Sequence, residues 1–218
     1  GLTAAYFLRT LGHAVTVFEA LPAAGGMMRT GIPEYRLPRN ILDSEIEDIE
    51  KIGIEIKLNA RVNSIEKLFD QGFNAVLLTM GAPNGTKMGI PGEEDAKVLD
   101  GISVLKAINL KEKIDLGKEI AVIGGGNVAI DVARCALRVG VQKVTMLYRR
   151  TRSEMPANDE EIEEAVSEGI KISYLAAPQR VLPGGNKLSL ECIRMKLGEP
   201  DASGRARPIP IEDSEFVI

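Results

Sequence analysis

Hydrophobic residues in positions 1–90 recur at helical spacing in some segments and form short apolar runs in others. Residues 2–11 have the spacing of a helix, and Gly12 is placed to end it. Residues 40–52 carry aliphatic side chains at a period of about 3.6, which predicts an amphipathic helix. The remaining elements expected here are strands at 14–19, 54–58 and 75–79 and a short helix at 62–69.

The next part of the chain alternates apolar strand-like runs with amphipathic segments. Residues 120–123 read as a buried parallel strand, and residues 127–139 read as a helix that ends at Gly140. Further helices are expected at 102–111 and 157–168, and further strands at 143–148 and 170–175. Strands that alternate with helices in this way indicate βαβ units and a parallel sheet.

The last forty or so positions have a different pattern. Residues 181–186 predict a hairpin turn. Apolar side chains then alternate, and the parity changes after Cys192, which predicts a β-bulge between Cys192 and Ile193. Residues 215–218 read as the start of another strand. The chain begins without Met and without a strand before its first helix, so we expect a fragment of a longer protein.

A glycine turn between the strand at 120–123 and the helix at 127–139 carries the clearest chemistry. Gly124 would allow a tight turn, Gly126 would let the backbone approach a pyrophosphate, and Ala129 would let helix and strand pack closely. The N-terminus of the helix, at Asn127 and Val128, would offer N–H groups and a positive dipole end to phosphate oxygens. The motif lies between two strands, which makes a dinucleotide site a specific prediction.

The residues after the next strand decide which dinucleotide fits. An acid at that position favours NAD, whereas Arg149 and Arg150 match a phosphate monoester such as the 2′-phosphate of NADP. Arg152 would add charge. The alternative is that the arginines form a solvated basic turn.

A second, shortened unit precedes this one. Its strand at 14–19 ends in Glu19, which would accept hydrogen bonds from a ribose diol, and Gly1 would be the last glycine of its turn. Gly25 and Gly26 follow in a loop that leaves backbone N–H groups unobstructed. Glu19 could equally be an exposed acid at the end of a strand.

Composition narrows the function classes. The chain has 218 residues, is 44% hydrophobic and 27% charged, and has a formal net charge of −4. We therefore expect no nucleic-acid partner and no membrane association. Cys135 and Cys192 are far apart and no CxxC occurs, which argues against a redox dithiol or iron–sulfur ligation in this chain and fits a cytoplasmic protein.

Several motifs together resemble the glutamate synthase small (beta) subunit family of FAD- and NADPH-dependent oxidoreductases. They are Glu19, the loop 24–38 (AGGMMRTGIPEYRLP), and the segments 79–82 (TMGA), 124–134 (GGGNVAIDVAR), 148–150 (YRR) and 154–157 (EMPA). This family resembles adrenodoxin-reductase-like enzymes, dihydropyrimidine dehydrogenase and the large subunit of ferredoxin:NADP reductases, which likewise bind two nucleotides.

The resemblance implies an α/β fold with two Rossmann-like domains of the glutathione-reductase type. These would be a partial FAD-binding domain at 1–90, without its first strand and glycine turn, and an NADPH-binding domain at 91–218. The residues implied for FAD are Gly1, Glu19, Gly25, Gly26, Met27, Val62 and Gly81. Those implied for NADPH are Gly124, Gly126, Asn127, Val128, Arg149 and Arg150.

The resemblance also implies hydride transfer from NADPH to FAD, with electrons passing to 4Fe-4S centres in a further N-terminal domain. The partner would be a large glutamate synthase subunit, or a ferredoxin-type acceptor in a ferredoxin-linked enzyme. The cofactors carry that chemistry, so no catalytic side chain is assigned. Glu160 or Glu161 could orient the nicotinamide, although a solvated acidic helix face explains them as well. A non-catalytic NADP-binding module is the alternative of a different class.

Overall fold

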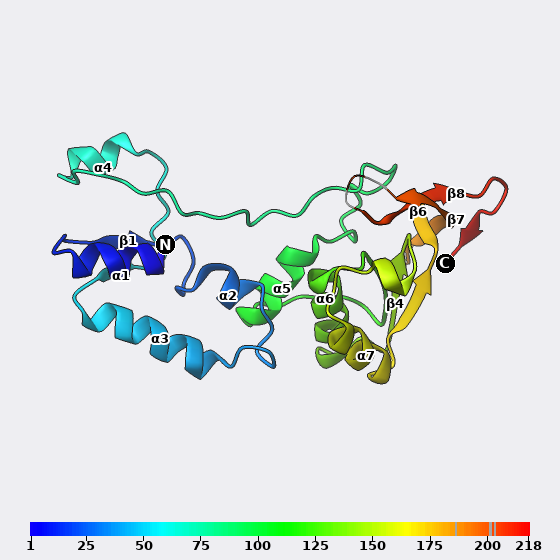
Figure 1. Ribbon diagram of the computed structural model, residues 1–218, viewed down its shortest axis with the longest axis horizontal. Coiled ribbons are helices and arrows are strands. Elements are labelled where there is room, and N and C mark those ends of the chain that lie inside the picture. Colours follow the sequence, from blue (N-terminus) through cyan, green and yellow to red (C-terminus); the bar gives the residue numbers. More distant parts are fainter. Residues whose placement is uncertain (186, 201, 203) are drawn as a thin grey trace. The chain divides into compact units, whose positions relative to one another are not determined.

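The computed structural model of the protein (Figure 1) describes residues 1–185, 187–200, 202 and 204–218. The chain forms two compact units, unit 1 at Gly1–Pro83 and unit 2 at Asn84–Ile218.

Unit 1 places helices beside a pair of short parallel strands (Figure 1). Its elements are α1 (Leu2–Thr10), β1 (Thr16–Phe18), α2 (Gly26–Thr30), α3 (Arg39–Lys51), β2 (Glu55–Lys57) and α4 (Glu66–Asp70). The helix α1 ends as expected before Gly12, whose φ of 94° is a left-handed conformation that glycine adopts without strain. A small core of Ala24, Leu42 and Ile46 joins the loop before α2 to the buried face of α3.

The strand expected at 75–79 does not form. Those residues have no strand assignment, and the side chains of Leu77 and Leu78 are 62% and 55% exposed. An apolar run becomes a buried strand only where a neighbouring strand accepts its hydrogen bonds, and in the described part of unit 1 the parallel pair consists of β1 and β2 alone. The prediction of a buried strand is therefore wrong for this structure.

Unit 2 is built on a three-stranded parallel sheet in the order β3-β4-β5. Its first elements are α5 (Gly101–Asn109), β3 (Glu119–Ile123), α6 (Asn127–Arg138), β4 (Lys143–Tyr148), η1 (Arg152–Glu154), α7 (Asp159–Ser167) and β5 (Lys171–Tyr174). The helix α6 contacts α5, α7 and the strands β3 and β4. Its inward side chains, among them Ile130, Ala133 and Ala136, are fully buried in the main core. The sheet and its two crossover helices confirm the predicted βαβ units.

An ion-pair network fastens α6 to the end of α7. The guanidinium of Arg134 is buried, and it pairs with Glu164 at 2.6 Å and with Glu168 at 2.7 Å. Arg138 donates to both carboxylate oxygens of Glu168, each at 2.8 Å. These hydrogen bonds from Arg138, together with those from Arg134, lower the pKa of Glu168 to about 2. The two arginines thus hold the second crossover helix against the first.

A second, antiparallel sheet follows the parallel one in sequence. It consists of β6 (Ala176–Leu182), β7 (Ser189–Pro200) and β8 (Ala206–Pro210), and β9 (Phe216–Val217) pairs with β7. The expected strand at 215–218 thus forms. The hairpin connection between β6 and β7 lies at 183–188, of which Asn186 is outside the described residues.

The bulge expected between Cys192 and Ile193 lies elsewhere. Ile193 pairs with Ala177 and Cys192 with Pro178, so the register is continuous there. It shifts on β6 instead, between Pro178 and Arg180. Cys192 is 0% and Ile193 7% exposed, so β7 is buried on both faces at this point. The change of parity reflects that burial rather than an inserted residue.

Candidate functional site

The glycine turn joins β3 to α6 at the carboxyl end of the parallel sheet. Gly124 has a φ of 135°, and a Cβ there would lie 3.3 Å from the Cβ of Ala129. A Cβ on Gly125 would lie 2.6 Å from the ring of Tyr148. Gly126 differs, because the nearest atom to its Cβ position is 3.7 Å away, in Pro156. The first two glycines serve internal packing, whereas a Cβ on Gly126 would make only an ordinary van der Waals contact.

The N-terminus of α6 lies at the surface. Gly126 is its N-cap, and among the described residues no side chain caps this end. Val128, in the first turn, is 46% exposed. The Oδ1 atom of Asn127 accepts a hydrogen bond of 3.3 Å from the backbone N–H of Asn158. Uncapped N–H groups at the start of a 12-residue helix suit a pyrophosphate.

The loop between β4 and α7 borders the same turn. The backbone N–H of Ala157 donates to the carbonyl of Gly125 at 3.3 Å. The hydroxyl of Tyr148 donates to the carbonyl of Glu154 at 2.5 Å. Thr151 and Glu154 form a capping box around η1, and the hydroxyl of Thr151 lowers the pKa of the Glu154 carboxyl. The EMPA segment is thereby fixed beside the glycine turn.

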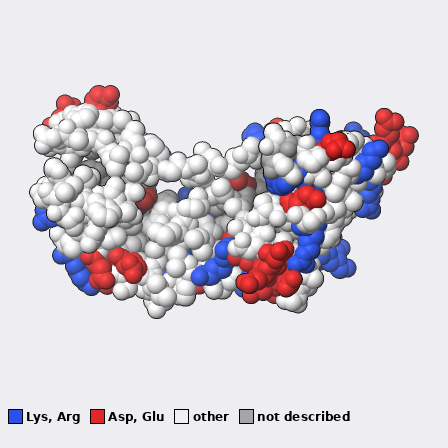
Figure 2. Space-filling model, in the orientation of Figure 1, with Lys and Arg blue, Asp and Glu red and all other residues white. Residues whose placement is uncertain are grey.

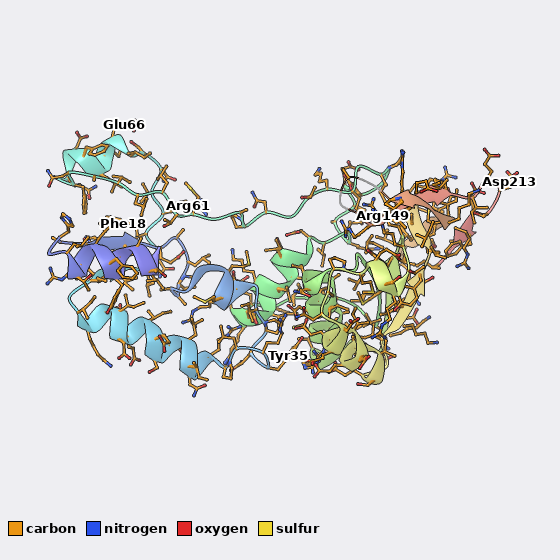
Figure 3. All side chains as sticks on the ribbon, in the orientation of Figure 1. Phe18, Tyr35, Arg61, Glu66, Arg149 and Asp213 are labelled. Atoms are coloured by element: carbon orange, nitrogen blue, oxygen red, sulfur yellow. The ribbon has the colours of Figure 1, made fainter. Side chains whose placement is uncertain are left out.

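The two predicted arginines have different environments at the end of β4. Arg149, which Figure 3 labels, is exposed. No described residue forms a hydrogen bond or an ion pair with its side chain. Arg150 is 3% exposed, and its Nε donates to the carbonyl of Ala206 in β8 at 2.7 Å. Arg152 is engaged by α7, since it donates to Glu163 at 3.0 Å.

Both arginines nevertheless line one pocket of about 690 Å³. The other lining residues come from the β7–β8 hairpin and are Glu199, Pro200, Ala202, Arg207, Pro208 and Ile209. Figure 2 shows basic and acidic side chains interspersed over unit 2, with acidic side chains gathered on α7. Arg207 is thus a third arginine that lines this pocket with Arg149 and Arg150. The sequence contains it in the short basic run 205–207, but nothing in the spacing connects that run with β4.

In unit 1 Glu19 lies directly after β1, beside the labelled Phe18 (Figure 3). Its backbone is held by β2 and the segment after it, since its N–H donates to the carbonyl of Lys57 at 2.9 Å and its carbonyl accepts from the N–H of Ala60 at 2.8 Å. Its Oε1 accepts from the backbone N–H of Leu21 at 2.8 Å. This bond orients the half-buried carboxylate, which keeps acceptor capacity for a diol.

The loop after Glu19 carries the remaining early candidates. Gly25 has a φ of 122°, and a Cβ there would lie 3.1 Å from Arg29 and 3.3 Å from Leu42. A Cβ on Gly26 would meet no atom within 4 Å. Met27 is 44% exposed. Gly25 is thus needed for packing against α3, and Gly26 and Met27 lie on accessible surface.

Three further candidates are spread over unit 1. A Cβ on Gly1 would lie 2.9 Å from the hydroxyl of Thr79, so the turn at the start of α1 meets the TMGA segment. Gly81 has a φ of 66° and no atom within 4 Å of its Cβ position. Val62 is 41% exposed in the segment after β2. The structure brings Gly1 and the TMGA segment together, and their contact with FAD stays a prediction.

Other reactive groups are poor candidates for chemistry. Burial raises the pKa of Cys135 and of Cys192 to about 11, so neither thiol is a reactive thiolate near neutral pH. In the described part of the chain no group of three His, Cys, Asp or Glu side chains could hold a metal ion. Glu160 is exposed and Glu161 half-buried on α7. No helix among the described residues is long and apolar enough to cross a membrane.

Curated relatives cover the chain fully. It is 46% identical to "NADP(+)-dependent formate dehydrogenase subunit beta" of Moorella thermoacetica and 43% identical to "NADPH-Fe(3+) oxidoreductase subunit beta" of Geobacter sulfurreducens. The matches cover 100% of this chain, but only 32% and 34% of the lengths of these two relatives. It is 35% identical, over 100% of the chain and 55% of the relative, to "Putative glutamate synthase [NADPH] small chain" of Cereibacter sphaeroides. The resemblance to glutamate synthase small chains is thereby confirmed.

Solved structures agree on the fold. "Mycobacterium tuberculosis FprA in complex with NADPH" matches 100% of this chain and 65% of its own, with a TM-score of 0.81 at 17% identity. Thioredoxin reductase of T. acidophilum matches 96% of this chain and 70% of its own, with a TM-score of 0.59 at 15% identity. The predicted α/β, Rossmann-like fold class is thus confirmed. Residues 1–196 match the model of the pyridine nucleotide-disulphide oxidoreductase family, and the chain belongs to that family.

Proposed function

We propose that this chain belongs to an NADPH-dependent flavin oxidoreductase, in which unit 2 binds NADPH and unit 1 contributes part of the FAD site. The observation that carries the proposal is the pair of features at the carboxyl edge of the parallel sheet. An uncapped helix start follows β3, and an arginine-lined pocket of about 690 Å³ follows β4. Adjacent parallel strands end at one edge, which is where dinucleotides bind in this fold class.

The residues present fit the cofactor chemically. Gly126 leaves room for a diphosphate, and Arg149 offers an unengaged guanidinium where NADP differs from NAD. The two cofactors, when bound, supply hydride transfer from nicotinamide to flavin. The protein's own residues bind and orient: the helix start of α6 holds phosphate, the pocket holds the adenosine end, and the Glu19 carboxylate accepts from a ribose.

The electron acceptor lies outside the chain described here. The two cysteines are buried and separate, so they do not fit as ligands of a 4Fe-4S cluster. We place such clusters, as the resemblance to glutamate synthase implies, in a further part of the protein. Relatives named as subunits of formate dehydrogenase, of an Fe(3+) oxidoreductase and of glutamate synthase support a subunit that delivers electrons to different partners.

Anaerobic reduction tests the proposed function. The full-length protein should be yellow from bound flavin, and NADPH should bleach it in the absence of oxygen, whereas NADH should act much more slowly. A colourless protein that still binds NADPH would replace this proposal with a non-catalytic NADP-binding module. The acceptor follows from assays of the reduced protein with ferredoxin, with Fe(III), and with glutamine plus 2-oxoglutarate in the presence of a large glutamate synthase subunit. Glutamate formation would assign it to glutamate synthesis, and reduction of ferredoxin or Fe(III) without glutamate formation in the presence of that subunit would exclude that role.

A further inference from the structure

The β7–β8 hairpin adds a third arginine to the pocket after β4, and this inference rests on the proposed NADPH site. Arg207 lies in β8, which is distant from β4 in sequence, yet it lines the same pocket as Arg149. Arg207 is exposed, and no described residue pairs with its guanidinium. Two unengaged guanidinium groups from two different sheets thus border one cavity.

The strand β7 carries a bulge directly opposite Arg207. On the β7–β8 ladder Leu197 pairs with Pro208 and Pro200 pairs with Ala206, with a register shift between the two pairs. Two residues of β7, Gly198 and Glu199, therefore lie opposite the single residue Arg207. Such bulges bend a strand and re-aim side chains, and they recur next to functional sites.

Gly198 leaves room for a pocket side chain at this bulge. A Cβ on Gly198 would lie 2.4 Å from the Cδ1 atom of Ile209, which itself lines the pocket. A larger residue at 198 would shift the exposed side chain of Ile209 beside Arg207.

Arg150 connects the hairpin to the parallel sheet. Its buried guanidinium donates through Nε to the carbonyl of Ala206, the residue before Arg207. Its own carbonyl accepts from the N–H of Leu175 at 3.1 Å. Arg150 thereby fixes the backbone beside Arg207 to the end of β4, where Arg149 lies.

The charges in the pocket match a phosphate monoester. The described lining residues carry three guanidinium groups and one carboxylate, that of Glu199. A phosphate monoester carries about −1.5 to −2 near neutral pH. Guanidinium groups on two sides can bind such a dianion with several charge-assisted hydrogen bonds.

We propose that Arg207 is a specificity-determining residue that binds the 2′-phosphate of NADPH together with Arg149. Arg150 is a positioning residue, because it acts by holding the strand that carries Arg207. The adjacent arginines at the end of β4 thus have different tasks, and the second phosphate ligand comes from the hairpin.

Binding of NADPH, NADH, 2′,5′-ADP and 5′-AMP to Arg207→Ala tests the proposal by calorimetry. Loss of a charge-assisted hydrogen bond should weaken NADPH and 2′,5′-ADP by about ten-fold or more, and NADH and 5′-AMP by less than about two-fold. Lys196→Ala is the matched control, since it removes an exposed cation from β7 outside the pocket. It should leave all four affinities unchanged.

The role of Arg150 is read from a double-mutant cycle. Arg150→Lys keeps the charge, so it should weaken NADPH if positioning matters and bind as wild type if charge alone matters. Adding Arg150→Lys to Arg207→Ala should cost little more than Arg207→Ala alone. Additive losses would overturn the positioning role. Thermal unfolding of each variant identifies any loss that comes from misfolding.

The outcomes separate this inference from the proposed function. If Arg207→Ala binds NADPH as wild type does, while Arg149→Ala loses the preference over NADH, the role of Arg207 is wrong and the NADPH site stands. If the wild-type protein binds NADPH and NADH equally, the proposed site itself is wrong.

Discussion

Replacing Glu168 by Gln should destabilise unit 2 in a pH-dependent way. The substitution keeps the size of the side chain and removes the charge that Arg134 and Arg138 share. Arg134 is 5% exposed, and it also pairs with Glu164. Removing one counter-charge from a buried guanidinium is costly.

The magnitude follows from the pKa of Glu168. Hydrogen bonds from Arg138, with those from Arg134, lower it from 4.5 to about 2. That difference corresponds to about 3 kcal/mol of preference for the charged form in the folded state. Because the side chain of Glu168 is 25% exposed, solvent screening reduces the value, and we expect about 2–3 kcal/mol.

The sign of the pH dependence is fixed by the direction of the shift. The folded-state pKa is below the unfolded one, so the contribution is complete above pH 4.5 and is lost as the pH falls toward about 2. Urea unfolding followed by circular dichroism should therefore show a gap between wild type and Glu168→Gln that is largest at pH 7. The gap should shrink to less than half at about pH 3.

The control for this prediction lies on the same helix. Glu163 pairs with Arg152 at 3.0 Å, but its side chain is 70% exposed. Glu163→Gln should change the free energy of unfolding by less than about 1 kcal/mol at any pH. Equal effects of the two substitutions, or a gap for Glu168→Gln that does not vary between pH 7 and 3, would refute the reasoning.

Four other substitutions test the sites. Gly125→Ala should lower the free energy of unfolding by about 1–3 kcal/mol, because its Cβ would lie 2.6 Å from the Tyr148 ring. Gly126→Ala should show wild-type stability in urea titrations, and it should weaken the binding of NADPH and of NADH equally. Glu199→Gln should increase the affinity for NADPH several-fold and leave the affinity for NADH unchanged. An unchanged NADPH affinity in calorimetry would show that the charge of Glu199 does not oppose NADPH binding. Glu19→Ala should lower the flavin content of the purified full-length protein while NADPH affinity stays the same, and full flavin retention would dismiss the ribose contact.

The pattern of apolar residues along the sequence predicted those helices and strands that pack against an element close to them in sequence. The strand at 143–148 forms with those bounds because its apolar run pairs on both sides, with β3 and with β5. The same kind of run at 75–79 stays exposed, because a strand also needs a partner, and period and composition do not supply one. Periodicity therefore locates candidate strands, and pairing decides which of them form.

In the candidate site, too, features set by adjacent residues could be predicted, whereas features set by contacts distant in sequence could not. The glycine turn could be predicted because its residues are adjacent and each has a steric reason to be small. The difference between Arg149 and Arg150 could not, because it depends on the carbonyl of Ala206, 56 positions away. Arg207 was missed for the same reason, since a strand register places it and no local motif marks it.

The ratio of the dissociation constants of NADH and NADPH tests the central claim most directly. If the pocket after β4 binds the 2′-phosphate, calorimetry on the wild-type protein should give at least about ten-fold tighter binding of NADPH. That preference should fall with added salt, because it comes from charge. Equal affinities for the two nucleotides at low salt would contradict the account.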